Sequence, residues 1–397
     1  MVAETVARAL HAELVRRMDL RRNEIERLDE TAFRQRASAL LSAILEETRL
    51  PPGCDLRALH RSVLQDCVGL GPLEDLLADD SISEIMVNGP KQIFVEREGR
   101  LRRHERVFDG VAALEGVIER LLAPTGRRVD EASPMVDARL RDGSRLNVVI
   151  PPLALAGPCV TIRKFRRQRL SLTDLVAMGS LSAPMAELLT TATRARLNIV
   201  ISGGTATGKT TLLNALANLI PREERLITIE DAAELALERD NLVGLESRPP
   251  NLEGAGQISI RDLLRNALRM RPDRIVIGEC RGGEALDMLQ AMNTGHTGSL
   301  TSVHANAPRD ALSRLEVMSL MAGLDLPLAA VRAQIASAVH LIVQIARLPG
   351  GRRCIVDLTE VTGMEQGIIQ SQQLFRFNGR DFESTSLPPS FLEGVAA

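Results

Sequence analysis

Apolar side chains recur every three to four positions in three stretches near the start of the chain, at residues 2–18, 33–45 and 56–64. This period matches one face of an α-helix, so the pattern predicts three amphipathic helices. Asp55, directly before the third stretch, is a suitable N-cap residue. No group of residues with catalytic or ligand chemistry lies here, and we therefore expect residues 1–67 to form a helical bundle that serves in docking.

Short runs rich in β-branched residues begin after Gly69, and turn-forming residues separate them. Their sequences are EIMVNG, QIFVERE, MVDARL, RLNVVI and VTIRKF, and one helical pattern lies near residues 109–123. These runs predict a small α+β domain at residues 68–165. The segment that follows, FRRQRLSLTD, is polar and basic, and we expect a linker at residues 166–180.

Apolar strands alternate with amphipathic helices over residues 181–397. The expected strands are LNIVISG, RLITIED, RIVIGE and SLTSVHA. One helix is expected to begin at residue 209, and four more are expected at 259–270, 282–293, 308–322 and 327–338. This alternation is typical of an α/β domain whose mostly parallel sheet is covered by helices on both faces.

The composition is that of a globular protein, since 45% of the 397 residues are hydrophobic and 25% are charged. The widest apolar stretch, residues 146–162, contains three prolines and is shorter than the ~20 residues of a membrane-spanning helix. The first residues show no secretory signal and the five cysteines form no CxxC pair, so we expect a cytoplasmic protein. A formal net charge of −2 and the lack of Trp and Tyr do not favour a nucleic-acid partner.

A phosphate-binding loop is predicted between the first strand of the α/β region and the helix after it, where the sequence fits the pattern GxxxxGK[ST]. Glycines let successive amides and the helix N-terminus face phosphate oxygens. Lys209, one of only three lysines in the chain, is expected to bridge phosphate oxygens, and Thr210 to offer its hydroxyl to Mg²⁺. The predicted nucleotide-binding residues are Gly203, Gly204, Thr205, Ala206, Thr207, Gly208, Lys209, Thr210 and Thr211.

Acidic residues end two later strands of the same sheet. Glu230 and Asp231 end RLITIED, and Glu279 ends RIVIGE. Ligands of such sheets bind at the carboxyl ends of the strands, so we expect these carboxylates beside the phosphates. A nucleoside triphosphatase needs one carboxylate to polarise water and another to hold the magnesium shell.

Two histidines flank the fourth strand. His296 lies just before this strand and His304 near its end, with glycines close by. We interpret them as sensors of the γ-phosphate. A zinc pair is disfavoured, because their i, i+8 spacing with no nearby cysteine is not a ligand spacing.

The ordered set of motifs resembles the secretion ATPases of type II, type IV and archaellum machines, and within them the CpaF/TadA-type ATPase of tight-adherence (Flp) pili. TIEDAAEL is similar to the aspartate box of this family, RPDRIVIGECRGGEALD to its Walker B segment and TGHTGSLTSVHAN to its histidine box. GPLEDLLADDSISEIMVNGP, LESRPPNLEGAG, NALRMRPD and LMAGLDLP are similar to the CpaF branch in particular. The resemblance covers the chain from Gly69 onward.

The resemblance implies a RecA-like P-loop NTPase domain, a smaller α+β (PAS-like) N-terminal domain and a leading helical bundle. It implies a homo-hexamer that hydrolyses ATP with Mg²⁺, peripheral to the bacterial inner membrane, where it works on platform proteins of a pilus or secretion machine. Pilus assembly, retraction or protein secretion would be the work done, with no direct nucleic-acid contact expected.

The resemblance also assigns roles to single residues. Glu230 takes the place of the catalytic carboxylate and Glu279 that of the Walker B acid, which is also expected to hold the metal together with Thr210. Arg145 in RDGSRLN and Arg163 in TIRKF are the arginines that the smaller domain would bring to the nucleotide. Further candidates from the larger domain are Arg271 and Arg281.

Two other hypotheses fit the same core. One is a DNA-translocating or conjugation-type secretion ATPase, against which the near-neutral charge and missing aromatic residues count. The other is a nucleotide-dependent scaffold that hydrolyses little, which the presence of Lys209, Glu230 and Glu279 disfavours.

Overall fold

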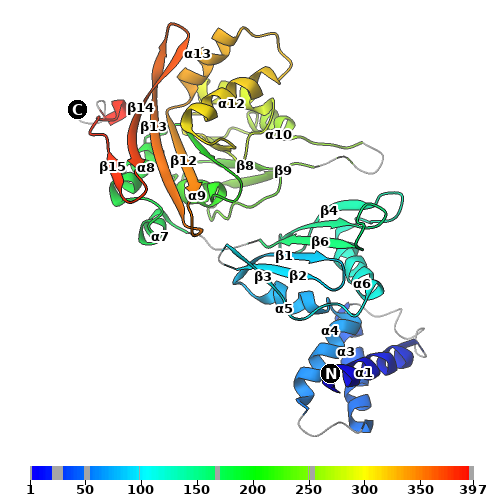
Figure 1. Cartoon of the computed structure of the whole chain (residues 1–397). Coiled ribbons are helices and arrows are strands. Elements are labelled where there is room, and N and C mark those ends of the chain that lie inside the picture. Colours follow the sequence, from blue (N-terminus) through cyan, green and yellow to red (C-terminus); the bar gives the residue numbers. More distant parts are fainter. Residues whose placement is uncertain are drawn as a thin grey trace. The chain divides into compact units, whose positions relative to one another are not determined.

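The structure, a computed structural model, describes residues 2–19, 30–48, 54–97, 99–165, 170–248, 250 and 255–392. The chain divides into two compact units, residues 1–166 and 167–397 (Figure 1). None of the helices in these described ranges is long and apolar enough to cross a membrane.

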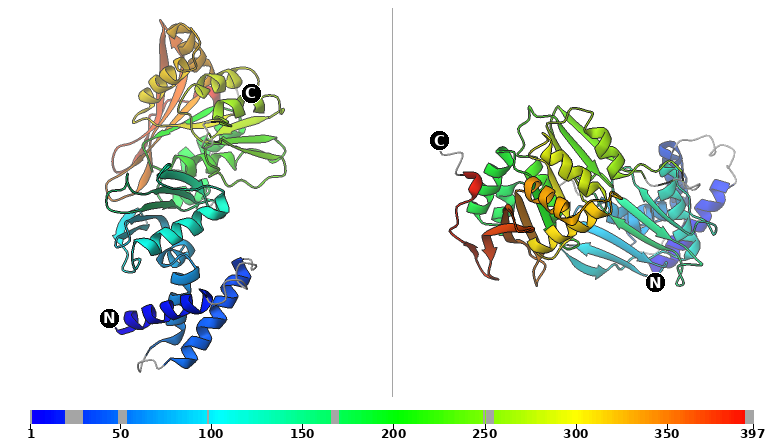
Figure 2. Two further views of the ribbon diagram at one scale, coloured as in Figure 1. Left: turned by 90° about the vertical axis from the view of Figure 1, so that its right-hand side faces the viewer. Right: turned by 90° about the horizontal axis from the view of Figure 1, so that it is seen from above.

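Three helices at the start of the first unit pack around a small apolar core, and they occupy the three ranges that the periodicity predicts (Figure 2). The carboxylate of Asp55 accepts hydrogen bonds from the backbone amides of Arg57 and Ala58, at 2.9 and 3.1 Å, and so forms the predicted N-cap. The helices are α1 (Val2–Asp19), α3 (Glu30–Glu47) and α4 (Leu56–Val68).

An antiparallel sheet of six strands, in the order β3-β2-β1-β6-β5-β4, forms the rest of the first unit. Helices α5 and α6 contribute to the apolar core on one face, and alternation along the strands leaves polar residues on the other. The elements are α5 (Pro72–Ala78), β1 (Ile82–Asn88), β2 (Ile93–Arg97), β3 (Arg100–Arg103), α6 (Val111–Leu122), η1 (Ala123–Thr125), β4 (Met135–Arg139), β5 (Arg145–Val149) and β6 (Cys159–Arg163). Both α5 and β3 were absent from the sequence-based prediction.

Arg106, in the loop before α6, ties the helices to the sheet domain. Its guanidinium donates to the side chains of Gln65 at 2.8 Å, Ser62 at 3.2 Å and Asp66 at 2.9 Å, all on α4. Burial raises the pKa of Asp66, and the charge of Arg106 opposes this shift. These hydrogen bonds link the helices to the sheet within the first unit.

Part of the range expected to be a linker is folded into the second unit. Ser171 and Asp174 form a capping box that begins the short helix α7 (Leu172–Ala177). Leu172 and Leu175 of this helix are buried in the core of the second unit. Residues 166–169, also within the expected linker, lie outside the described residues.

A nine-stranded sheet organises the second unit, in the order β15-β14-β13-β12-β7-β11-β10-β8-β9. The strands from β12 to β9 in this order are parallel, whereas β13, β14 and β15 add antiparallel neighbours. The strands are β7 (Ile199–Gly203), β8 (Leu226–Glu230), β9 (Leu242–Glu246), β10 (Arg274–Ile277), β11 (Leu300–Val303), β12 (Leu341–Arg347), β13 (Arg353–Glu365), β14 (Ile368–Phe377) and β15 (Phe382–Ser384).

Helices cover both faces of this sheet, as predicted (Figure 1). Ile199 and Ile201 of β7 enter the core beneath α8 and α9, while Val200 between them enters the core beneath α10 to α13. The helices are α8 (Ala183–Arg194), α9 (Lys209–Ala217), α10 (Ile260–Ala267), α11 (Glu284–Asn293), α12 (Pro308–Leu320) and α13 (Leu328–Ala338), with a short η2 (Ser390–Leu392) near the end.

Candidate active site

The predicted phosphate-binding loop joins β7 to α9. A Cβ atom on Gly203 would lie 2.5 Å from the carbonyl oxygen of Ile345 and 2.7 Å from Oγ1 of Thr207, so the loop has no space for a side chain there. Gly208 has a φ of 102°, which favours glycine, and Thr207 closes the turn by donating to the carbonyl of Gly204 at 2.9 Å. The loop therefore needs glycines at two of the positions that the sequence pattern requires.

Lys209 begins helix α9 and is largely buried, with 8% of its surface exposed. Its Nζ donates to the carbonyl oxygens of Gly203 and Gly204, at 3.0 and 2.9 Å, which holds the ammonium inside the curve of the loop. Thr210 and Thr211 follow in the first turn of the helix, where backbone amides and the helix dipole favour an anion. Thr205 and Ala206 complete the loop between strand and helix.

Parallel pairing brings the candidate carboxylates and one histidine to the edge of the sheet where this loop lies. Strands β7, β11, β10 and β8 are neighbours and run in the same direction. Their carboxyl ends carry Gly203, His304, Glu279 and Glu230 respectively. Ligands of parallel sheets bind at this edge.

His304 contacts both Lys209 and Glu279. Its Nδ1 lies 3.3 Å from Nζ of Lys209, and its Nε2 lies 2.8 Å from Oε1 of Glu279. Burial lowers the pKa of His304, and the nearby Lys209 lowers it further. A neutral ring can accept from the ammonium, and Nζ of Lys209 lies 3.3 Å from Nδ1 and 3.5 Å from Nε2.

Arg281 joins Glu279 to the other acidic strand end. Its guanidinium donates to Oε2 of Glu279 at 3.0 Å and lies 3.4 Å from Oδ2 of Asp231. The hydrogen bond with Glu279 raises the pKa of Arg281. The sequence indicates Arg281 as a candidate for the nucleotide, and the structure adds that it bridges the carboxylates after β8 and β10.

Glu230 ends β8 as a buried carboxylate, with 4% of its surface exposed. Its Oε2 accepts hydrogen bonds from the backbone amides of Glu234 at 2.8 Å and Leu235 at 3.1 Å. Burial raises its pKa to about 7, even though these amides favour the ionised form and oppose the shift. A carboxyl group with a pKa close to neutral is suited to accept a proton at physiological pH.

Two predicted residues lie away from this cluster. His296 precedes β11 and Arg271 precedes β10, so both lie at the amino ends of parallel strands, whereas Lys209 lies at the carboxyl edge. Of the two candidate histidines, the fold therefore brings His304 to the edge of the sheet that carries the phosphate loop. Of the two candidate arginines in the second unit, it brings Arg281 there.

Arg145 and Arg163 belong to the first unit, where they lie opposite one another on β5 and β6. Arg139 on β4 pairs with Arg145, so three arginines form a row across the sheet. Buried Leu146 and Ile162, their neighbours in sequence, point to the other face, which packs against the helices. The row is therefore on the polar face of the sheet.

Sequence reasoning missed two residues that join helix α9 to the segment after Glu230. Asn214 is buried within α9 and accepts from the amide of Ala236, while Arg239 donates to carbonyls at the end of α9. A single amide side chain among the apolar residues of LLNALA was the available signal for Asn214. Nothing comparable marks Arg239 in a chain rich in arginine.

The chemistry of the oxygen donors at this edge fits a magnesium ion shared with phosphate. Within the described residues, no group of three or more His, Cys, Asp and Glu side chains is arranged to hold a metal ion alone. Mg²⁺ commonly takes one or two protein oxygens together with phosphate oxygens and water. Thr210 and Glu279 are the residues that would supply them.

Comparison with known proteins gives the family. The profile of the type II/IV secretion system proteins matches residues 66–381. The chain is 40% identical over 316 residues to a putative conjugal transfer protein of Mycobacterium tuberculosis (strain ATCC 25618 / H37Rv), covering 78% of this chain and 89% of that relative. It is 34% identical over 319 residues to the type IV secretion system protein PtlH of Bordetella pertussis (strain Tohama I), covering 73% and 93%. The chain therefore belongs to the type II/IV secretion system protein family.

The fold is also found among solved structures. The pilus retraction motor PilT with bound ADP is similar with a TM-score of 0.53 at 20% identity, over 77% of this chain and 82% of that one. At this level of identity the likeness concerns the fold alone. It agrees with the expectation of an α/β fold.

Proposed function

We propose that the protein hydrolyses ATP to ADP and phosphate and uses the energy as a motor of a secretion or pilus machine. The observation that carries this proposal is the contact between the phosphate loop and the acidic strand ends, through Lys209, His304 and Glu279. Binding of phosphate alone would not require a buried carboxylate, Glu230, at the same edge.

Each residue then has a role in phosphoryl transfer. The amides of the loop and Lys209 hold the phosphate oxygens and offset the charge that develops as the bond breaks. Glu230 polarises the attacking water and accepts its proton. Bound Mg²⁺, held by Thr210 and Glu279, would neutralise phosphate charge.

The finer proposal is a homo-hexameric, cytoplasmic motor of the CpaF/TadA type, attached to inner-membrane platform proteins of a tight-adherence pilus. The first unit would correspond to the PAS-like domain and the helical bundle. The segments similar to the CpaF branch, such as LMAGLDLP, support this assignment. In this proposal Arg145 and Arg163, which pair on neighbouring strands, are the arginines that act on the γ-phosphate and report which nucleotide is bound.

A conjugation-type ATPase is the second candidate, and the name of the mycobacterial relative favours it. The two candidates differ in their response to DNA. A conjugation motor that acts on DNA should be stimulated by single-stranded DNA, whereas a pilus motor should not respond.

The experiment that tests the proposal measures ATP turnover by the purified full chain and its Glu230→Gln variant. The amide has nearly the size of the carboxylate but cannot accept the proton, so the variant should bind ATP and fail to cleave it. Equal turnover by both proteins would contradict the proposed function. Repeating the assay with single-stranded DNA separates the two candidates.

A further inference from the structure

The segment between β8 and β9 lies along helix α9, although residues 231–241 form no regular secondary structure. Its middle is held by Asn214 of α9, whose Oδ1 accepts from the amide of Ala236 at 2.9 Å. Leu235 and Leu237 on either side pack against the apolar core that contains α9. We refer to residues 231–241 as the β8–β9 loop.

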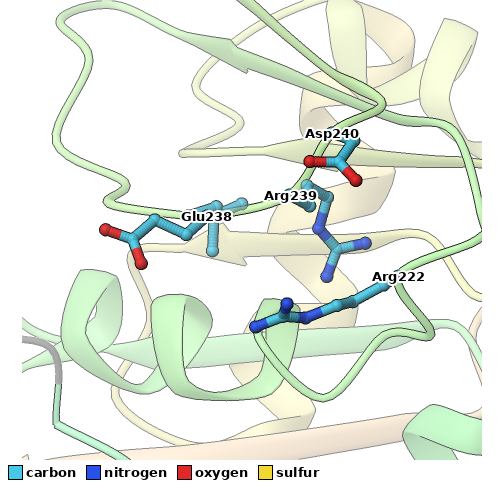
Figure 3. Close-up of a pocket in the computed structure, with 5 residues that line it drawn as sticks. Arg222, Glu238, Arg239 and Asp240 are labelled. Atoms are coloured by element: carbon cyan, nitrogen blue, oxygen red, sulfur yellow. The ribbon is translucent and has the colours of Figure 1, made fainter.

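Arg239 holds the far end of the β8–β9 loop. Its Nη2 donates to the carbonyls of Ala217 and Ile220, both at 3.0 Å, and its Nη1 to that of Pro221 at 3.3 Å. These carbonyls lie at and just after the end of α9, where a cation is favourable. Figure 3 shows the side chain of Arg239 extending from the loop toward the segment that carries Arg222.

Arg222 and Arg239 line a common cavity of about 400 Å³, together with Leu237, Glu238 and Asp240 (Figure 3). They differ in what they contact. Arg239 donates to the carbonyls at the end of α9, whereas the Arg222 side chain makes no hydrogen bond with the described residues. Arg222 therefore offers a matched control.

The near end of the loop supplies the two amides that bind Glu230, from Glu234 and Leu235. We propose that Asn214 and Arg239 are positioning residues for hydrolysis, which fasten the β8–β9 loop to α9 and so hold these amides against the Glu230 carboxylate. This inference rests on the proposed function of Glu230. Because α9 begins with Lys209, the phosphate cradle and the support of the carboxylate are then parts of one rigid assembly.

The charges around Glu230 give this role a specific signature. Burial is the main cause that disfavours the ionised form of Glu230, the charges of Glu234 in its own loop and Glu246 of β9 add to it, and the two amides oppose them. Without the amides, the carboxyl would hold its proton to a higher pH. A loosened loop should therefore move the acid limb of the activity profile, whereas a general loss of stability would not.

The test compares Asn214→Leu, which lacks the acceptor oxygen, with Asn214→Asp, which keeps one. We expect Asn214→Leu to lower kcat about tenfold, since a small misplacement of a catalytic group has effects of this size or larger. The affinity for a fluorescent ATP analogue should stay within about twofold of the parent, and the acid limb should shift to higher pH. Asn214→Asp should recover most of the turnover.

Arg239→Met should reproduce the Asn214→Leu phenotype, and Arg222→Met, in the same cavity, should leave turnover unchanged. The inference would be overturned if Asn214→Leu and Arg239→Met both had the same kcat and the same pH profile as the parent protein. Joint loss of nucleotide binding and turnover would also overturn it, because these residues would then support the phosphate loop. Glu230→Gln distinguishes failure of the proposed function from failure of this inference. If Glu230→Gln still hydrolyses ATP, the proposed function fails. If Glu230→Gln is inactive while Asn214→Leu has normal turnover, only this inference fails.

Discussion

Nε2 of His304 lies 2.8 Å from Oε1 of Glu279 at the carboxyl edge of the parallel sheet. The other ring nitrogen lies 3.3 Å from Nζ of Lys209, so one imidazole contacts both a cation and an anion. Without the ring, Lys209 and Glu279 would be free to pair with each other. The arrangement keeps both groups available for phosphate and its metal ion.

Replacement of His304 should therefore reduce turnover more than binding. We expect His304→Ala to lower kcat about 100-fold, the effect found when a mutation misplaces a catalytic group. His304→Asn should retain more activity, because its amide can accept from Lys209 and donate toward Glu279. Steady-state kinetics of the two variants test this, and equal activity of alanine and asparagine would argue against a bridging role.

The raised pKa of Glu230 predicts how activity depends on pH. The carboxylate accepts a proton only when ionised, so kcat should fall as the pH drops below about 7. A kcat profile measured from about pH 5 to about pH 9 checks this. An acid limb near the ordinary value of 4.5 would show that Glu230 is not the titrating base.

The raised pKa of Glu230 also predicts how the stability of the folded chain depends on pH. The folded chain holds the Glu230 proton more tightly than the unfolded chain, so its stabilising effect is complete below pH 4.5 and is lost as the pH rises through about 7. Glu230→Gln removes this dependence. The Tm difference between variant and parent should therefore grow in favour of the variant across this interval.

Arg145 and Arg163 give a prediction about assembly. If they act on a nucleotide, Arg145→Ala and Arg163→Ala should slow turnover and largely spare ATP affinity, because neither belongs to the phosphate loop. Arg102→Ala, at an exposed position of β3, is the control. If the complete site needs a neighbouring subunit, activity per subunit should fall on dilution as the oligomer dissociates. A constant rate in monomers would show that each subunit is self-sufficient.

Arg106 makes a structural prediction about the first unit. Arg106→Ala removes three hydrogen bonds to α4, and partial exposure to solvent reduces their value, so we expect a loss of about 1–2 kcal/mol. Calorimetry should show a lower Tm for the transition of this unit. Arg100→Ala, exposed on β3, should not change it. An unchanged transition in Arg106→Ala would mean that the hydrogen bonds of Arg106 do not hold the helices to the sheet.

The motif-bearing part of the fold could be predicted because its strands are continuous apolar runs and its helices are long and amphipathic. Parallel strands then place Gly203, Glu230 and Glu279 at one edge without any knowledge of side-chain contacts. The contact of His304 with Lys209 was beyond the sequence, because it depends on side-chain orientation across neighbouring strands.

Other elements could not be predicted, because their sequences carry too little hydrophobic periodicity. Helix α7 is six residues long, which is less than two turns of periodicity, and its capping box is the main local sign. The β13–β14 pair contains register shifts at Leu358/Thr359 and Val361/Gly363, and such bulges interrupt the alternation that marks a strand. The β8–β9 loop has no period at all, so its contacts with α9 appear only in the fold.

Turnover of ATP by the full chain and by Lys209→Ala tests the central claim most directly. The ammonium lies inside the phosphate loop, bonded to Gly203 and Gly204, and its loss should weaken nucleotide binding and remove transition-state stabilisation. We predict measurable hydrolysis by the parent and a loss of about 100-fold or more in the variant. Near-normal turnover by Lys209→Ala would contradict the assignment of this loop as the catalytic nucleotide site.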